Sequence, residues 1–161
     1  MRALLAALFL ATTAGRAAIE VRPVAGAATL VRDVSHGKPV VLHFWATWCG
    51  ACHAEFPRLR AALLRLPAQG VSVALVSIDE LAQREKAEEM LGTYQLTALP
   101  AILLEAPDPG PVAKAVGDPK WDGTLPATFV FDARGKLVKS FIGVTSPGAL
   151  AAAVRKVLRA R

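Results

Sequence analysis

Cys49 and Cys52 are the only cysteines in this chain of 161 residues, and two residues separate them. A short apolar run at residues 40–45 predicts a strand just before them, and the residues from 49 onward predict a helix. A cysteine at a helix N-terminus ionises readily because the helix dipole and the unpaired N–H groups stabilise its thiolate. We therefore expect Cys49 to be the reactive sulfur. Cys52, one helical turn on, would be the buried sulfur that resolves a mixed disulfide. A structural disulfide or a pair of core thiols is the alternative.

A unit of strand, helix and strand positions this pair. The apolar residues of the predicted helix recur on one face, at Cys52, Phe56, Leu59, Leu63 and Leu66. Pro57 has no backbone N–H and predicts a kink in that helix. A second apolar run at 71–78 predicts the next strand, at the spacing of a right-handed parallel βαβ unit.

The rest of the chain continues the alternation of helices and strands. We expect a helix at 81–94, a short strand at 101–105, a hairpin with strands at 127–131 and 136–141, and a last helix from 147. Residues 106–123 contain four prolines and three glycines, so we expect mostly loop there, with one helical turn at 112–116. Such a loop is the expected seat of specificity. Together these elements predict an α/β fold with a mixed sheet.

Three features resemble the thioredoxin-like superfamily, and within it the exported thiol–disulfide oxidoreductases of the TlpA and ResA kind. The segment FWATWCGAC at 44–52 is similar to their active-site segment, Pro57 to their helix-kinking proline, and LPATFVFD at 125–132 to their cis-proline segment. The resemblance covers residues 38–160 and implies a mixed central sheet flanked by helices on both faces. We accordingly divide the chain into a signal peptide at 1–17, an N-terminal extension at 18–37 and a thioredoxin-like domain at 38–161.

The same resemblance implies a substrate site beside the cysteines. Pro126 would be cis and stand next to Cys49, and with Leu125 and Trp48 it would shape a groove for a substrate polypeptide. An ordinary trans proline in a turn is the alternative.

Two further residues are candidates for proton handling. Glu55 lies three residues after Cys52, on the same side of the helix, and matches a glutamate to which the resemblance gives a role in proton transfer. An exposed surface glutamate is the alternative. His43 stands where cytoplasmic thioredoxins carry a buried aspartate, and Leu75 stands where they carry a lysine. His43 is thus a second proton-handling candidate, with a hydrogen-bonded core histidine as the alternative.

The first residues predict an export signal. Arg2 precedes an apolar stretch at 3–11, and small residues follow it, so we expect cleavage near residue 14 or 17. The apolar stretch is shorter than the roughly 20 residues that span a bilayer, although an uncleaved signal would leave an anchor. We expect a periplasmic or otherwise exported protein, in which two cysteines are usually paired.

The formal net charge of +6 does not predict a nucleic-acid partner. Much of the excess lies in the last helix, at Arg155, Lys156, Arg159 and Arg161. Cations are favourable near a helix C-terminus, and no aromatic residues interleave with them. We therefore expect no nucleic-acid binding. We also expect the protein to be a monomer.

Two other classes of function use the same residues. The pattern from Cys49 to Cys52 and His53 is also that of covalent haem attachment in c-type cytochromes. The two thiolates with His53 or His43 would also suit copper.

We favour a thiol–disulfide oxidoreductase without a metal or a cofactor other than the Cys49–Cys52 disulfide. The resemblance implies the reducing direction, with protein disulfides as substrates, a role in cytochrome c maturation and a membrane thiol transporter as reductant. A disulfide-forming oxidant is the alternative.

Overall fold

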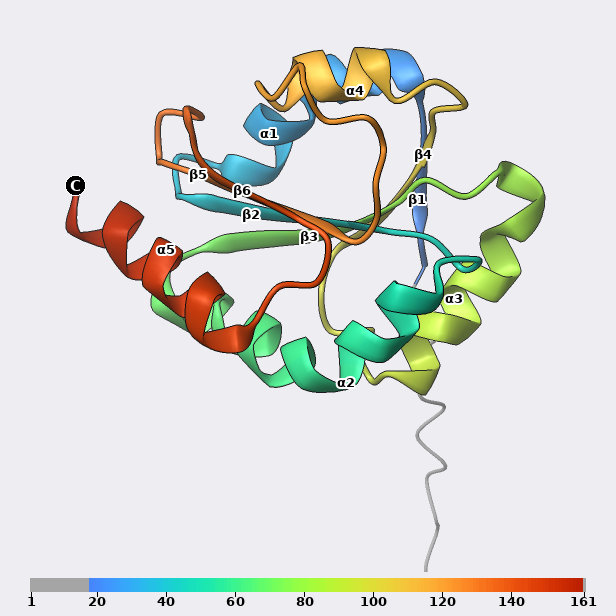
Figure 1. Cartoon of the computed structure of the whole chain (residues 1–161), viewed down its shortest axis with the longest axis horizontal. Helices are drawn as coiled ribbons and strands as arrows, with labels where there is room; N and C mark the ends of the chain where they lie inside the picture. Colours follow the sequence, from blue (N-terminus) through green and yellow to red (C-terminus); the bar gives the residue numbers. More distant parts are fainter. Residues whose placement is uncertain (1–17, 161) are drawn as a thin grey trace, which may run out of the picture.

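A six-stranded sheet forms the centre of the structure, a computed structural model that describes residues 18–160 (Figure 1). The strands lie in the order β1-β4-β3-β2-β5-β6. Their bounds are β1 (Glu20–Pro23), β2 (Val40–Trp45), β3 (Ser72–Ser77), β4 (Ala101–Glu105), β5 (Ala127–Phe131) and β6 (Leu137–Ile142). The first four strands in this order, β1, β4, β3 and β2, pair in parallel. Strand β5 pairs antiparallel with both β2 and β6. Every residue of β2 is buried, as expected for a strand covered on both faces.

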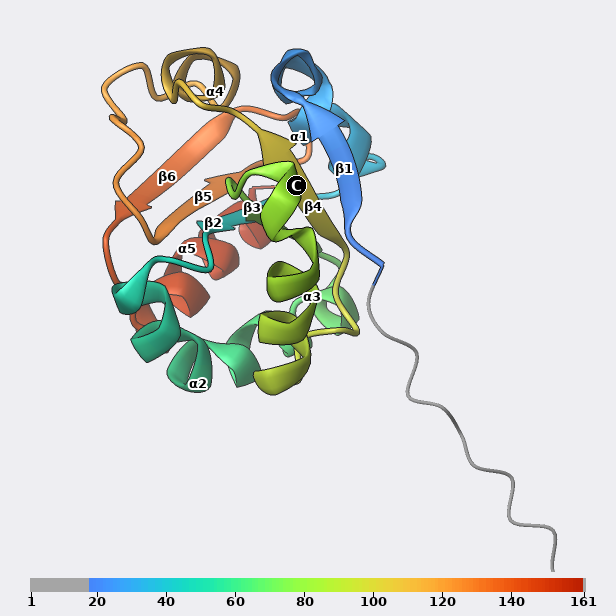
Figure 2. The same cartoon turned by 90° about the vertical axis from the view of Figure 1, so that its right-hand side faces the viewer.

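Helices cover both faces of the sheet. The helices α2 (Gly50–Arg65), α3 (Arg84–Thr93) and α5 (Pro147–Arg159) lie on one face, and α1 (Ala27–Ser35) and α4 (Gly110–Ala115) lie on the other (Figures 1 and 2). Short 3-10 turns complete the described part of the chain, at η1 (Val24–Gly26), η2 (Pro67–Gln69) and η3 (Leu81–Gln83). Each face has its own apolar core, one built around Phe56 and Leu59 of α2 and one around Phe44 and Phe129 of the sheet. The predicted mixed α/β sheet with helices on both faces is confirmed.

The segment 18–37 has more structure than an extension. It contains β1, which pairs in parallel with β4, and α1, which lies beside α4 (Figure 2). The sheet therefore crosses the boundary that we placed at residue 38. The four residues of β1 show little alternation of apolar and polar side chains, so their sequence does not predict a strand. The pairing with β4 is what orders them. The predicted signal peptide, residues 1–17, lies outside the described residues.

Two predicted elements differ in detail. The helix expected at 81–94 is divided into η3 and α3. The loop region at 106–123 contains α4, which begins two residues before the predicted turn. Within residues 18–160, no helix combines the length and the apolar character needed to cross a membrane.

The strand register sets the position of the site. In the pairing of β2 with β3, Trp45 lies opposite Ser77, so the carboxyl ends of the two strands meet at one edge of the sheet. The loops that leave these strands, at 46–49 and 78–80, are therefore neighbours. This edge is where α/β sheets usually place their functional residues.

Candidate active site

The two cysteines form a disulfide at the start of α2. Cys49 is the N-cap residue of this helix, and its sulfur accepts a hydrogen bond of 3.1 Å from the backbone N–H of Cys52. Cys49 is 7% exposed, whereas Cys52 is fully buried among the apolar residues of α2. An incoming thiolate thus meets Cys49 first, and the N–H of Cys52 is already placed to stabilise a thiolate on Cys49 when the disulfide opens.

A buried carboxylate holds the loop that carries the pair. Asp79 follows β3 and accepts hydrogen bonds from the backbone N–H of Thr47 at 2.9 Å and from its hydroxyl at 2.7 Å. The hydroxyl of Ser77 donates to the same carboxylate at 2.6 Å. This contact fixes residues 46–49 to the end of the neighbouring strand and leaves Trp48 65% exposed. Asp79 was not among the predicted site residues, although a polar residue just after a buried strand was the available signal.

The bond between Leu125 and Pro126 is cis. It directly precedes β5, whose first residue Ala127 lies opposite Phe44 of β2. The carbonyl of Pro126 accepts a hydrogen bond of 2.8 Å from the N–H of Gly143, which ties this turn to the end of β6. Leu125 is half-buried and packs against both apolar cores. A role of Pro126 and Leu125 in substrate binding stays a prediction.

Glu55 is not a surface residue, because its side chain is fully buried against His43. Oε2 of Glu55 lies 3.5 Å from Nε2 of His43, and neither atom has a hydrogen-bond partner. Oε1 of Glu55 accepts a hydrogen bond from the backbone N–H of Thr145, and Nδ1 of His43 lies 2.9 Å from the hydroxyl oxygen of Thr128. The fold thus joins two residues of the predicted site that lie twelve positions apart in the sequence.

Burial changes the protonation of both groups. Removal from water raises the pKa of Glu55 to about 7, against the opposing effect of the hydrogen bond from Thr145. Removal from water lowers the pKa of His43 to about 4. A carboxyl with a pKa near neutrality and a neutral imidazole suit the transfer of a proton at physiological pH. Leu75 lies opposite His43 on β3, so no lysine faces the pair from that position.

His53 has contacts that a haem or copper ligand would have to give up. Its Nδ1 lies 2.9 Å from the hydroxyl of Tyr94 and its Nε2 lies 2.9 Å from the carbonyl oxygen of Thr47. In the part of the chain that the structure describes, no three His, Cys, Asp or Glu side chains are grouped so that they could hold a metal ion.

The strand order, the Cys-x-x-Cys disulfide at the start of α2 and the cis-proline before β5 define a thioredoxin-like protein with a dithiol site. Solved structures agree with this fold. StoA from Bacillus subtilis superposes with a TM-score of 0.57 at 24% identity, over 73% of this chain and 83% of that one. The putative thiol:disulfide interchange protein DsbE from Chlorobium tepidum superposes with a TM-score of 0.58 at 25% identity, over 79% and 84%.

The chain belongs to the AhpC/TSA family, whose sequence profile matches residues 17–140. Among curated proteins, it is 30% identical over 113 residues to the thiol-disulfide oxidoreductase ResA of Bacillus subtilis (strain 168), a match that covers 66% of this chain and 54% of that protein. It is 31% identical over 121 residues to the thiol-disulfide oxidoreductase ResA of Bacillus anthracis, a match that covers 75% and 64%. The chain thus spans between half and two thirds of the length of these relatives.

Proposed function

We propose that this protein is a thiol–disulfide oxidoreductase that reduces disulfides of other polypeptides. The observation that carries the proposal is the asymmetry of the pair: Cys49, at a helix N-terminus, keeps 7% of its surface exposed, and Cys52 is fully buried. A structural disulfide needs no such asymmetry. The named relatives, both called thiol-disulfide oxidoreductase ResA, support the same activity.

The reaction transfers two electrons in two exchange steps. The thiolate of Cys49 attacks one sulfur of the substrate disulfide, a mixed disulfide forms, and the first substrate sulfur leaves as a thiolate. Cys52 then loses its proton and attacks the sulfur of Cys49, which releases the second substrate thiolate and forms the Cys49–Cys52 disulfide. The substrate is reduced to two thiols and the protein is oxidised.

Glu55 accepts the proton of Cys52 in this proposal. The two residues are neighbours on α2 at a spacing of three, and Glu55 has a pKa near neutrality. Since Oε1 is engaged by the N–H of Thr145, the proton on Glu55 is held at Oε2, which faces Nε2 of His43. His43 then acts as a positioning residue: it stays neutral, and its Nδ1 is held by Thr128.

Export and the physiological partners belong to this proposal as well. Residues 1–17 have the pattern of an export signal, so we place the protein in the periplasm or another exported location. A membrane thiol transporter would return two electrons to the disulfide after each cycle. The resemblance to the TlpA and ResA group makes apocytochromes that carry a disulfide the proposed substrates, whose reduction supplies the thiols used in cytochrome c maturation.

Single-cysteine variants test the activity. Cys52→Ala, reduced and mixed with a disulfide-containing polypeptide, should accumulate a mixed disulfide on Cys49 that is visible on a non-reducing gel. Cys49→Ala should form none. A Cys52→Ala protein that turns over as fast as the parent would contradict the two-step mechanism.

The reduction potential of the pair tests the direction. A value near or below that of thioredoxin, about −270 mV, agrees with a reductase, whereas a value near −120 mV would identify a disulfide-forming oxidant.

A further inference from the structure

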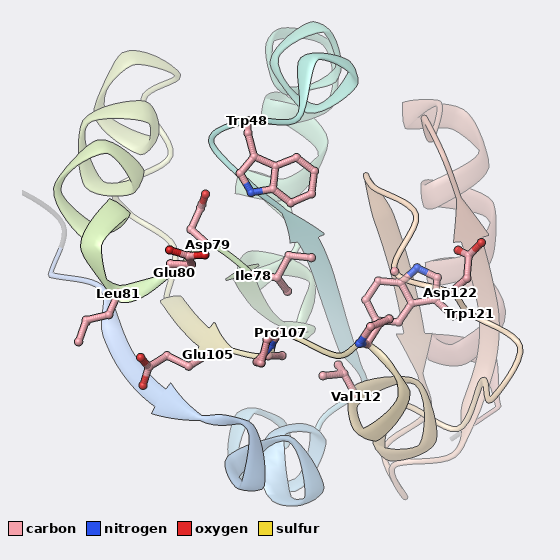
Figure 3. Close-up of a pocket in the computed structure, with 13 residues that line it drawn as sticks. Trp48, Ile78, Asp79, Glu80, Leu81, Glu105, Pro107, Val112, Trp121 and Asp122 are labelled. Carbon is pink, nitrogen blue, oxygen red and sulfur yellow. The ribbon is translucent and has the colours of Figure 1, made fainter.

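A groove of about 640 Å³ begins at Trp48, the residue before Cys49 (Figure 3). The exposed ring of Trp48 forms one wall, and Trp121, which is 4% exposed, forms the facing wall. Ile78 lies between them, and Pro107 and Val112 belong to the apolar lining. The groove is thus continuous with the surface through which a substrate must reach Cys49.

The far wall is rigid. The indole N–H of Trp121 donates a hydrogen bond of 2.9 Å to the carbonyl of Thr124, and its ring packs against Phe44 and Phe129 at centroid distances of 5.0 and 5.3 Å. A wall anchored in the core in this way keeps the groove open without a ligand, so an incoming chain need not order it.

All the charges that line the groove are negative. Glu80 follows β3, Glu105 ends β4 and Asp122 lies in the loop after α4, so three separate segments bring carboxylates to the groove. Asp79 also lines it, but its carboxylate is buried and already accepts hydrogen bonds from Thr47 and Ser77. Among residues 18–160, no lysine, arginine or histidine lines it, although the chain as a whole carries a formal charge of +6. Within residues 18–160, no cationic side chain forms an ion pair with Glu80, Glu105 or Asp122. The charge of the groove is therefore opposite in sign to the net charge of the chain.

Building on the proposed function, we propose that this groove selects the substrate: it binds a polypeptide segment in which lysine or arginine flanks the reactive cysteine. A basic side chain matches both features of the groove, since its carbon stem packs on apolar surface while its charged end reaches a carboxylate. The exposed ring of Trp48 adds a further attraction for a cation. The same carboxylates would repel an acidic segment.

Two disulfide-bonded synthetic peptides of equal length test this selection. One carries lysines beside its cysteines and the other carries glutamates, and the rate of their reduction by the reduced protein is measured. The parent protein should reduce the lysine peptide about tenfold faster at low ionic strength, because three surface charges each contribute modestly. The preference should nearly vanish at about 1 M salt, where the Debye length is about 3 Å.

The variant Glu80→Gln/Glu105→Gln/Asp122→Asn removes the three charges and keeps the shape of the side chains. Asp122→Asn retains the oxygen that accepts hydrogen bonds from the N–H and hydroxyl of Thr124. The matched control, Glu20→Gln/Glu85→Gln/Glu89→Gln, removes as many charges from residues outside the groove. We expect the preference to be lost in the first variant and kept in the second.

Binding to the oxidised protein separates this inference from the proposed function. Fluorescent versions of the peptides with serine in place of cysteine are titrated against oxidised protein, and their anisotropy is followed. If the parent reduces neither peptide, the proposed function fails, while tighter binding of the lysine peptide still supports the groove. Equal binding and equal reduction of both peptides, or a preference that survives in the groove variant, would overturn the inference. So would a dimer in sedimentation that only the groove variant abolishes, because the occupant would then be a second copy of the chain.

Discussion

Nε2 of His43 and Oε2 of Glu55 face each other at 3.5 Å inside the protein, fully buried and without any other hydrogen-bond partner. Burial moves their pKa values in opposite directions, to about 4 for His43 and about 7 for Glu55. Between these values the folded pair holds its proton on the carboxyl. In the unfolded chain, the proton is on the imidazole between pH 4.5 and 6.5. Both states bind the same number of protons there, so the pair makes the free energy of unfolding nearly independent of pH in this range.

Removing either partner should expose a pH dependence, and the two variants should have opposite signs. In Glu55→Gln, the remaining His43 binds a proton only in the unfolded state, so the free energy of unfolding should fall by about 3 kcal/mol as the pH drops from 6.5 to 4. In His43→Gln, the remaining Glu55 is protonated in the folded state, so the free energy of unfolding should fall by about 3 kcal/mol as the pH rises from 4.5 to 7.

Urea unfolding of the disulfide-intact proteins at several pH values measures these slopes. The parent protein is the control, because the two contributions cancel in it. Slopes of the same sign in both variants would contradict the assignment of the proton to Glu55.

Glu55→Gln should also slow one step of the exchange. Loss of a general base costs at least about a hundredfold in the step that it assists, here the attack of Cys52 on the mixed disulfide. The first attack, by Cys49, should keep its rate. Rapid quenching with acid, followed by separation of the mixed disulfide, distinguishes the two steps. Glu89→Gln on the exposed side of α3 serves as the control, and an equal loss in both steps would argue against a role as base.

Asp79 should stabilise the loop before Cys49. Asp79→Ala leaves the buried hydroxyl of Ser77 and the N–H and hydroxyl of Thr47 without their acceptor, and we expect a loss of about 2–3 kcal/mol in the free energy of unfolding. Asp79→Asn keeps one acceptor oxygen and should lose less. Denaturant unfolding measures both, with Asp108→Ala at an exposed position as the control. Equal stability of Asp79→Ala and the parent would show that this contact does not hold the loop.

The two tryptophans of the groove should respond differently to substitution. Trp48 is 65% exposed, so Trp48→Ala should leave the free energy of unfolding within about 0.5 kcal/mol of the parent while slowing exchange with polypeptides. Trp121 is buried against Phe44 and Phe129, so Trp121→Ala should lose about 3–5 kcal/mol. Thermal unfolding combined with exchange rates separates the two effects. A large loss of stability in Trp48→Ala would mean that its ring supports the fold instead of the substrate.

Local features were sufficient to locate the redox pair. The apolar run of β2, the stripe of α2 and the position of Cys49 between them are properties of neighbouring residues, so periodicity alone predicts a reactive sulfur at a helix N-terminus with a buried partner one turn on. The segment LPATFVFD likewise indicated the cis bond at Pro126 through its resemblance to a known family.

Contacts between distant segments were beyond the reach of such patterns. The sequence indicated Glu55 and His43 separately as candidates for proton handling, and left open a surface glutamate and a core histidine. It could not decide between these, because burial depends on what packs around a side chain. Asp79 holds Thr47 across 32 positions, and β1 exists as a strand only through its pairing with β4. The sequence by itself determined which residues carry the thiol chemistry, since that follows from residue type and local periodicity. The tertiary structure decided which groups surround them, because the register of β2 against β3 and β5 brings His43, Thr128 and the end of β3 to the start of α2.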